Sequence, residues 1–208
     1  EAQKATLLEH NDRLASQGLR VLSVAFRDFD IDSWSEIQSS GIAIEDLVSD
    51  LVLLALIGIV DPPRPEAREA IAQARVAGIA VKMITGDHAT TAAAIGRELG
   101  LGENGQVVSI TGPELNHLTD EQLEEVAQVT HVFARVSPEH KIRLVAALQR
   151  RGHVVAMTGD GVNDAPALKK ADIGVAMGRK GTAAAREAAD RVLTDDNFAS
   201  IANAVAEG

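Results

Sequence analysis

Apolar runs and helical repeats alternate along most of the chain, in the order that is typical of parallel α/β architecture. Short apolar runs predict strands at residues 19–26, 51–60, 79–84, 107–110, 132–134, 154–157 and 173–176. Apolar positions at helical spacing predict helices at residues 65–77, 91–99, 138–151 and 183–189, and others that begin at Thr119 and Ala165. The run at 51–60 contains no polar side chain, so it predicts a strand that is buried on both faces.

The predicted helix boundaries follow from capping chemistry. Thr119 and Gln122 have the spacing of a capping box, in which each side chain binds the backbone N–H of the other residue. Ser137 and Pro138 have the preferred cap and first helical positions, and Gly152 follows as a stop. The sequence therefore predicts a helix that begins just before Lys141.

Two consecutive prolines, Pro62 and Pro63, mark the clearest boundary between two parts of the chain. Residues 1–60 precede them, and a more regular α/β unit at 61–208 follows. The longest apolar run has ten residues, whereas a membrane-spanning helix needs about 20. Because the chain begins inside a predicted helix and without an initiator Met, we expect a piece excised from a longer protein.

Composition and charge exclude several kinds of partner. The formal net charge of −10 argues against nonspecific binding to nucleic acid or anionic lipid, and favours cations. The absence of cysteine excludes disulfides and thiolate metal sites. Aromatic residues make up only 2% of the chain, so the core must be packed from alanine, valine, isoleucine and leucine.

Residues 157–166, Met-Thr-Gly-Asp-Gly-Val-Asn-Asp-Ala-Pro, place two carboxylates on a glycine-flanked turn between a strand and a helix. Gly159 and Gly161 permit a tight backbone, so Asp160 projects from the end of the strand. Magnesium prefers carboxylate oxygens and keeps several waters, so one or two acids and a substrate phosphate suffice for a site. The alternative for this segment is a solvated acidic turn.

Two further candidates, Thr85 and Lys141, also follow predicted strands. The carboxyl ends of parallel strands meet in one crevice, so we expect Thr85, Lys141 and Asp160 to form one site. The Thr85 hydroxyl and the Gly86 amide can donate to phosphoryl oxygens, and Lys141 can neutralise their charge. Such a set suits phosphoryl transfer, whereas each residue taken alone is more often an ordinary turn threonine or solvated lysine.

Segments 85–87, 137–141 and 158–166, in this order and spacing, resemble three motifs of the P-type cation-transporting ATPases, which have a haloacid dehalogenase-like fold. Residues 61–64, Asp-Pro-Pro-Arg, resemble the hinge between the nucleotide-binding and phosphorylation domains of this family. This hinge is more similar to those of calcium, sodium, potassium or proton pumps than to those of heavy-metal pumps, and among these we expect a calcium-pump-like relative. The tail matches the family as well, at residues 171–178 and 195–208. The resemblance implies an α/β fold with a doubly wound, Rossmann-like parallel sheet, preceded by a partial nucleotide-domain segment at residues 1–60.

The resemblance also implies an ATP-driven cation pump in which an aspartate is phosphorylated and dephosphorylated, with Mg²⁺ and ATP as cofactors. It implies that Asp160 binds Mg²⁺ with Asp164, that Asn163 shapes this site, and that Lys141, Thr85 and Gly86 bind the phosphoryl group. The catalytic set would thus comprise Thr85, Lys141, Asp160, Asn163 and Asp164. The nucleotide-binding set would comprise Arg20, Asp61, Arg64, Asp87 and Arg135.

The sequence departs from the family pattern at one decisive point, because it contains no Asp-Lys-Thr-Gly-Thr motif. By the order of motifs in the family, the phosphorylated aspartate is expected upstream of residue 1, and residues 61–208 correspond to the rest of the phosphorylation domain. We expect a gap in the parallel sheet where its strand would lie, and an exposed sheet edge. The resemblance implies that this piece is inactive alone, and that its partners are ATP, phosphate and the remaining nucleotide-binding, actuator and transmembrane domains, on the cytoplasmic face of a membrane.

Two alternatives remain open from the residues themselves. Asp28, in Asp28-Phe29-Asp30, imitates the Asp-x-Asp signature of haloacid dehalogenase-like phosphatases, so the chain could be a self-contained phosphatase. Asp61 is a poorer nucleophile candidate, because Pro62 and Pro63 lack the amide hydrogens that would hold a phosphoryl group. The second alternative is a noncatalytic module that binds magnesium, phosphate or nucleotide.

Overall fold

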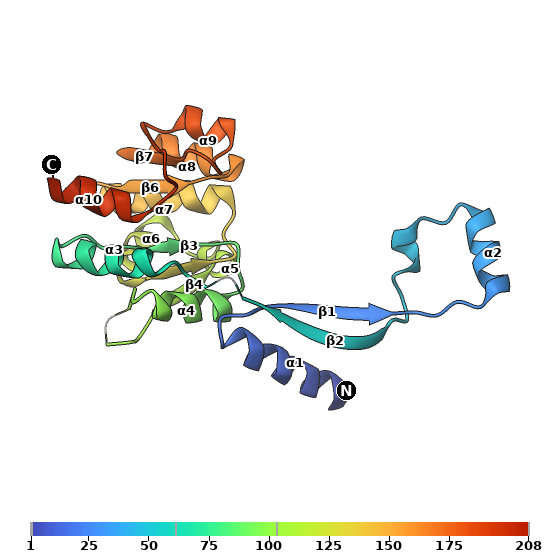
Figure 1. Cartoon of the computed structure of the whole chain (residues 1–208). Helices are drawn as coiled ribbons and strands as arrows, with labels where there is room; N and C mark the ends of the chain where they lie inside the picture. The colour runs from blue at the N-terminus through green and yellow to red at the C-terminus, as the bar shows by residue number, and fades with distance from the viewer. Residues whose placement is uncertain (1, 61, 103, 208) are drawn as a thin grey trace.

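The computed structural model describes residues 2–60, 62–102 and 104–207, which form a layered α/β body and a long arm (Figure 1). The body contains two parallel sheets with helices packed around them. The arm leaves the body along two strands and carries a short helix at its far end (Figure 1). The mixed architecture with parallel sheets confirms the predicted α/β class.

The body contains two separate three-stranded sheets. In the first, β5 (Val132–Ala134) lies between β3 (Met83–Ile84) and β4 (Ser109–Thr111), and all pairings are parallel. In the second, β7 (Ile173–Met177) lies between β6 (Ala156–Gly159) and β8 (Arg191–Leu193), again in parallel. Within the described residues no strand pairs β3 with β6, so each of these strands has one unpaired edge. The expected gap in the parallel sheet is thus present.

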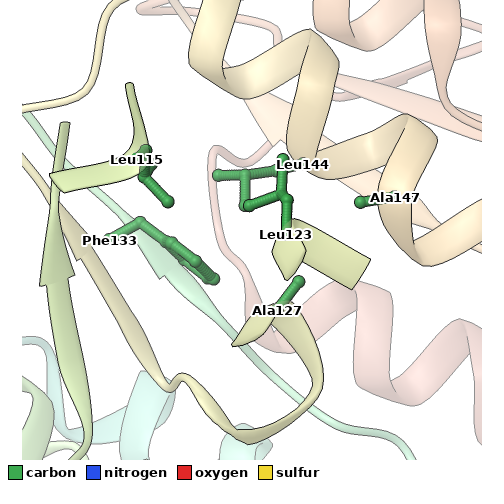
Figure 2. Close-up of a cluster of buried hydrophobic side chains, with 6 residues drawn as sticks. All are labelled: Leu115, Leu123, Ala127, Phe133, Leu144 and Ala147. Carbon is green, nitrogen blue, oxygen red and sulfur yellow. The ribbon is translucent and has the colours of Figure 1, made fainter. Parts of the chain in front are cut away.

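Side-chain packing joins the two sheets along β3 and β6. Ile84 of β3 packs against a buried cluster that contains Met157 of β6. The same side chain also packs against the cluster that covers the first sheet. That cluster contains Phe133 of β5 beneath side chains from α5, α6 and α7, as Figure 2 shows for Leu115, Leu123, Ala127, Leu144 and Ala147. Since burying a leucine or phenylalanine contributes about 1.5–3 kcal/mol, these clusters hold the sheets in position without a connecting strand.

Most helices of the body occur where the sequence places them, although their lengths differ slightly and two of them were not predicted. They are α3 (Pro65–Val76), α4 (Ala89–Glu98), α5 (Gly112–Leu115), α6 (Asp120–Val129), α7 (Pro138–Arg150), α8 (Ala165–Lys170), α9 (Ala183–Ala188) and α10 (Ala199–Glu207), with a 3-10 turn η2 (Val162–Asp164) before α8. The capping box is confirmed at α6, where Thr119 N donates to Gln122 Oε1 at 2.9 Å and Gln122 N donates to Thr119 Oγ1 at 3.3 Å. No helix in the described ranges has both the length and the apolar character needed to cross a membrane.

A histidine completes the corresponding cap of α7. His140 Nδ1 accepts from Ser137 N at 3.0 Å, and its Nε2 lies 2.7 Å from Asn116 Oδ1. Because Nδ1 accepts from a backbone N–H, the ring proton belongs on Nε2, which donates to Asn116. Burial, with the charge of Arg143, holds the pKa of His140 below its usual value. The neutral imidazole therefore fixes the first turn of the helix that carries Lys141.

The arm departs from the prediction for residues 51–60. It consists of α1 (Ala2–Ala15), β1 (Arg20–Phe26), α2 (Ile31–Ser40), the 3-10 turn η1 (Ile44–Leu47) and β2 (Val52–Ile59). The prediction of a strand buried on both faces is wrong, because β2 pairs in antiparallel with β1 alone and Leu54 is 68% exposed. A two-stranded ribbon has two open faces, and although α1 contacts both strands, most of the large apolar side chains of β2 remain exposed.

Other elements also differ from the prediction. The strand predicted at 79–84 contains only Met83–Ile84, and that predicted at 154–157 is shifted to Ala156–Gly159. The apolar pattern did not predict α2, α5, β8 or α10. Strand bounds depend on which backbone groups find a partner, and apolar runs carry no information about that pairing.

The state of His140 predicts a pH dependence of stability. Above about pH 6.5, the usual pKa of histidine, the ring is neutral in both the folded and the unfolded protein. As the pH falls below that value the unfolded state is protonated first, so the free energy of unfolding decreases until the lower folded-state pKa is reached. His140→Gln keeps an acceptor for Ser137 N and does not titrate, so urea denaturation at pH 7.5 and 5.5 should show a smaller acid loss than in the unmodified chain.

The exposed His153, just beyond α7, provides the matched control. His153→Gln should leave the acid loss of the unmodified chain in place. An acid loss in His140→Gln as large as in that control would show that His140 does not hold the cap in its neutral form.

Candidate functional site

The residues at the ends of β3 and β5 are joined by backbone hydrogen bonds. Val136 N donates to Thr85 O at 3.3 Å, and Arg135 N donates to Asp87 O at 3.2 Å. These contacts place the 85–87 loop against the segment that leads into α7. The Thr85 loop and the helix that carries Lys141 are therefore fixed to each other.

Lys141 and the Asp160 loop are joined through a single carboxylate. Lys141 Nζ lies 2.5 Å from Asp164 Oδ1, and the two side chains are only 16% and 11% exposed. The other oxygen, Asp164 Oδ2, accepts from Asp160 N at 3.1 Å and from Gly161 N at 3.0 Å. The turn is tight enough that a Cβ on Gly159 would lie 2.4 Å from Asp164 Cβ, so this position requires glycine.

Thr85 lies at the same end of the body as Lys141 and Asp160. Its neighbour Ile84 packs against the cluster that includes Met157 of β6, and Ile142 of α7 joins the same cluster. Thr85 and Asp160 each follow a strand at its carboxyl end. The structure thus brings the three predicted segments together, with the β3–β6 gap between the two sheets.

The charge state of Asp164 depends on its partners. Burial raises the pKa of Asp164, but the hydrogen bond and charge of Lys141 and the amides of Gly161 and Asp160 outweigh burial, so the net pKa lies below the usual value. Asp164 is therefore an ionised carboxylate whose two oxygens are both engaged by the protein.

Asp160 and Asn163, in contrast, are exposed, and neither side chain has a hydrogen bond or an ion pair to the described residues. No group of three or more histidine or acidic side chains that could hold a metal occurs in the described part of the chain. The free carboxylate of Asp160 fits a site of the kind that magnesium forms with one acid, a phosphate and waters. Asp164 is already engaged by Lys141, so it can support this loop more readily than it can offer a free ligand oxygen.

Thr85 and Asp87 are bound to each other. Thr85 Oγ1 donates to Asp87 Oδ2 at 2.9 Å and accepts from Asp87 N at 3.0 Å. An added Cβ on Gly86 would meet nothing within 4 Å, so the backbone between these residues faces open space. The loop is held in shape while its Gly86 segment stays accessible.

A cavity of about 650 Å³ lies beside this loop, between α1, β1 and the body, and three of the predicted nucleotide residues line it: Arg20, Asp87 and Arg135. Its volume is in the range of small-molecule sites. Asn11 and His88 also line the cavity, and no sequence signal marked them because neither belongs to a motif. Arg64 is not among the lining residues, since its guanidinium donates to Asp196 O at 3.2 Å. Asp61 lies outside the described residues.

Arg135 has an unusual backbone conformation for a residue with a side chain, with a φ of 51°. A left-handed conformation costs roughly 1–2 kcal/mol for such a residue. The hydrogen bond to Asp87 O on one side, and the close approach of Gly112 on the other, maintain it: a Cβ on Gly112 would lie 2.2 Å from Arg135 O. Local strain of this kind gathers at functional sites, and here it accompanies a charged residue that lines the cavity.

Replacing Lys141 should show how much a buried, unpaired Asp164 carboxylate destabilises the folded chain. Lys141→Met leaves a buried carboxylate without its cation, so the free energy of unfolding should fall by about 3 kcal/mol at pH 7. Stability from the depressed Asp164 pKa is present above its unfolded value near pH 4 and is lost as the pH falls through the folded value. Urea denaturation should therefore show the difference between the two proteins shrinking below about pH 4.

Two further variants test this explanation. Lys141→Met with Asp164→Asn removes the buried charge and should be more stable than Lys141→Met alone. Arg151→Met breaks only long ion pairs at the surface, at 3.7 Å from Glu124 and 3.9 Å from Glu125, and should cost less than about 1 kcal/mol. Equal losses in Lys141→Met and Arg151→Met would contradict a special role for the buried pair.

Comparison of the sequence with known proteins identifies the family of this chain. Two models of the haloacid dehalogenase-like hydrolases match the chain, at residues 8–172 and 142–205. The whole chain is 49% identical over 208 residues to a calcium-transporting ATPase of Bacillus cereus, of which it covers 22%. It is 50% identical over 209 residues to a calcium-transporting ATPase of Bacillus subtilis, of which it again covers 22%. It is 48% identical over 209 residues to a calcium-transporting ATPase of Saccharomyces cerevisiae, with 100% of the chain and 21% of that protein aligned.

The chain thus spans about a fifth of the length of the curated relatives it matches. Similarity to these cation-transporting enzymes extends over the arm as well as the body. The match to the family models covers most of the chain, from α1 to the loop before β7, and the second extends it to α10. The chain belongs to the haloacid dehalogenase-like hydrolases, and the resemblance to cation-transporting ATPases holds along its full length.

Proposed function

We propose that this chain is part of an ATP-driven cation-transporting P-type ATPase, on the cytoplasmic face of a membrane. In that protein it supplies residues that bind magnesium and the phosphoryl group while an aspartyl phosphate forms and is hydrolysed. The observation that carries this proposal is the connection from Lys141 through Asp164 to the Asp160 loop, beside a gap between two parallel sheets. The names of the relatives, which are calcium-transporting ATPases, support it.

The nucleophile in this proposal is an aspartate from a strand outside this chain. A strand parallel to β3 and β6 would use their unpaired edges and would end beside Thr85 and Asp160. Its carboxylate would attack the γ-phosphorus of ATP, the bond to the ADP oxygen would break, and water would later displace the aspartate from phosphorus. The chain's own residues would supply positioning and charge for both steps.

Each site residue has a proposed role that fits its surroundings. The Gly86 amide donates to a phosphoryl oxygen, and the Thr85 hydroxyl, whose one proton goes to Asp87 Oδ2 here, would turn from Asp87 to the phosphoryl group. Lys141, which has three N–H donors, contacts the phosphoryl group while paired with Asp164. Asp160 is the proposed carboxylate ligand of magnesium, Asp164 shapes its loop, and the exposed Asn163 side chain is free to contribute to the same site. When bound, magnesium supplies positive charge that offsets the developing charge on the phosphoryl oxygens.

The cavity beside this site is the proposed nucleotide pocket. Arg20 and Arg135 would pair with ATP phosphates there, and Asp87 would face the nucleotide. Arg64 and Asp61 remain proposed hinge residues. In the proposed division, residues 1–60 close a nucleotide-binding domain, and residues 61–208 form a phosphorylation domain without its phosphorylated aspartate.

The alternative of a self-contained phosphatase is not supported. Asp28 lies between β1 and α2, at the far end of the arm from β6 (Figure 1). Its neighbour Asp30 is engaged as the cap of α2, where it accepts from Ser33 N at 2.8 Å. An aspartate at this place cannot reach a phosphoryl group held by Lys141 and Thr85.

Thermal denaturation with ligands tests the proposed site in the chain as it stands. Magnesium with ATP should raise the melting temperature, because ligands that bind only the folded state stabilise it. Asp160→Asn should abolish the part of the rise that depends on magnesium. Asp28→Asn is the matched control on the arm and should retain the full rise, whereas an equal rise in Asp160→Asn and the unmodified chain would contradict the assignment of Asp160.

Labelling with γ-phosphate-labelled ATP and magnesium tests the nucleophile. The proposal expects no acid-stable, hydroxylamine-sensitive adduct from this chain, because the acceptor aspartate is elsewhere. An adduct that appears in the unmodified chain and disappears in Asp28→Asn would overturn the proposal in favour of the phosphatase.

A further inference from the structure

Residues 178–182 form a strap between β7 and α9, and this strap is held at an unusual number of points. Asp196 accepts from three consecutive backbone amides: Gly178 N and Arg179 N donate to its Oδ1 at 2.7 and 2.9 Å, and Lys180 N donates to its Oδ2 at 2.8 Å. The Arg186 guanidinium donates to the carbonyls of Gly178 and Gly181. A carboxylate therefore binds the amides of the strap while a guanidinium binds its carbonyls.

The end of the strap nearest α9 contacts the Asp160 loop directly. Thr182 N donates to Asp160 O at 2.8 Å. The strap approaches the end of β7 so closely that position 181 requires glycine, since a Cβ there would lie 1.9 Å from Met177 O. The backbone of Asp160 is thus fixed from one side by the Asp164 carboxylate and from the other side by the strap.

Asp196 is itself fixed in place. Its φ of 54° is left-handed, and Arg64 donates to its carbonyl oxygen at 3.2 Å. The three amides that it accepts from keep the pKa of this carboxyl below its usual value, so it is a charged acceptor at neutral pH. Aspartate is one of the few residues with a side chain that adopt this conformation readily, so the residue type at position 196 suits both its backbone and its role as acceptor.

We infer that Asp196 is a positioning residue for the Asp160 loop: it holds the 178–182 strap, and the strap holds the Asp160 backbone. Asp196 does not touch the reacting atoms. The part of this inference that concerns magnesium rests on the proposed function, whereas the part that concerns the order of the loop does not. Removing the supports of a metal ligand commonly weakens metal binding about 10- to 100-fold.

Amide hydrogen exchange, followed by NMR, tests the inference without magnesium. Asn at position 196 tolerates the left-handed conformation but loses the charge that binds three amides. In Asp196→Asn the Thr182 amide, which donates to Asp160 O and not to residue 196, should exchange about tenfold faster. The amide of the core residue Leu144 should be unchanged. Unchanged Thr182 exchange in a folded Asp196→Asn would overturn the inference.

Magnesium titration, followed through the Asp160 amide resonance, tests the consequence for the proposed site. Asp196→Asn should bind magnesium about tenfold more weakly than the unmodified chain. Asp195→Asn removes the same charge one residue away, where the carboxylate accepts from Asn197 N and Ser200 Oγ at the start of α10. The magnesium affinity of Asp195→Asn should stay within about twofold of that of the unmodified chain. If the loss of one negative charge were the whole cause, both variants would bind magnesium equally weakly.

Arg186→Gln distinguishes a positioning effect of the strap from a purely electrostatic effect on magnesium binding. The same variant tests the inference if Asp196→Asn does not fold. Removing a positive charge near the loop should tighten magnesium binding if charge alone matters. If the strap positions Asp160, the same change should weaken binding and speed Thr182 exchange. Tighter binding in Arg186→Gln would overturn the inference. If Asp160→Asn titrates like the unmodified chain, the proposed function fails, and the exchange of Thr182 still decides the inference.

Discussion

The Lys141–Asp164 contact is the interaction on which the site depends. The two oxygens of the carboxylate bind different partners, because one pairs with the ammonium on α7 and the other accepts from the first two amides after β6. Taking these charges from water is costly, and only complete pairing makes the arrangement stable. One carboxylate thereby fixes the distance between a helix and a loop that are far apart in the sequence.

The other half of the site is organised by backbone contacts and close approach. The 85–87 loop is bound to residues 135 and 136, and Arg135 keeps a left-handed backbone because Gly112 allows its carbonyl to come close. The position of Arg135 at the cavity is therefore fixed by a strained backbone and its close contacts. The positions of Lys141 and the Asp160 loop near the sheet gap are fixed by a buried ion pair. Asp160 is the exposed group between these rigid parts, fixed through its backbone and free at its carboxylate.

Much of the body could be predicted from the sequence, because local rules decide it. The caps at Thr119 and Ser137, and the strand at 132–134, depend on residues that are neighbours in the chain. The convergence of Thr85, Lys141 and Asp160 followed from the rule that parallel strands end at one edge. What the sequence could not reveal are contacts between distant segments: the ion pair of Lys141 with Asp164, the direction of Arg64 toward Asp196, and the open faces of β2. Apolar residues at 51–60 specify a strand, but which surface covers that strand depends on chain that is remote in sequence.

The separation of the body into two sheets has a consequence for how the chain folds. Residues 83–134 contain all of β3, β4 and β5, and residues 156–193 contain all of β6, β7 and β8. Each sheet is therefore built from one continuous stretch of chain, although Met83 of β3 pairs with Val132 of β5, 49 residues later in the sequence. The strands of one sheet can pair without the strands of the other. We expect such stretches to act as separate cooperative units that are connected by α7 and associate where Ile84 packs against Met157 and where α10 packs against α3. Assembly is therefore expected to comprise the formation of each sheet, followed by the association of the two.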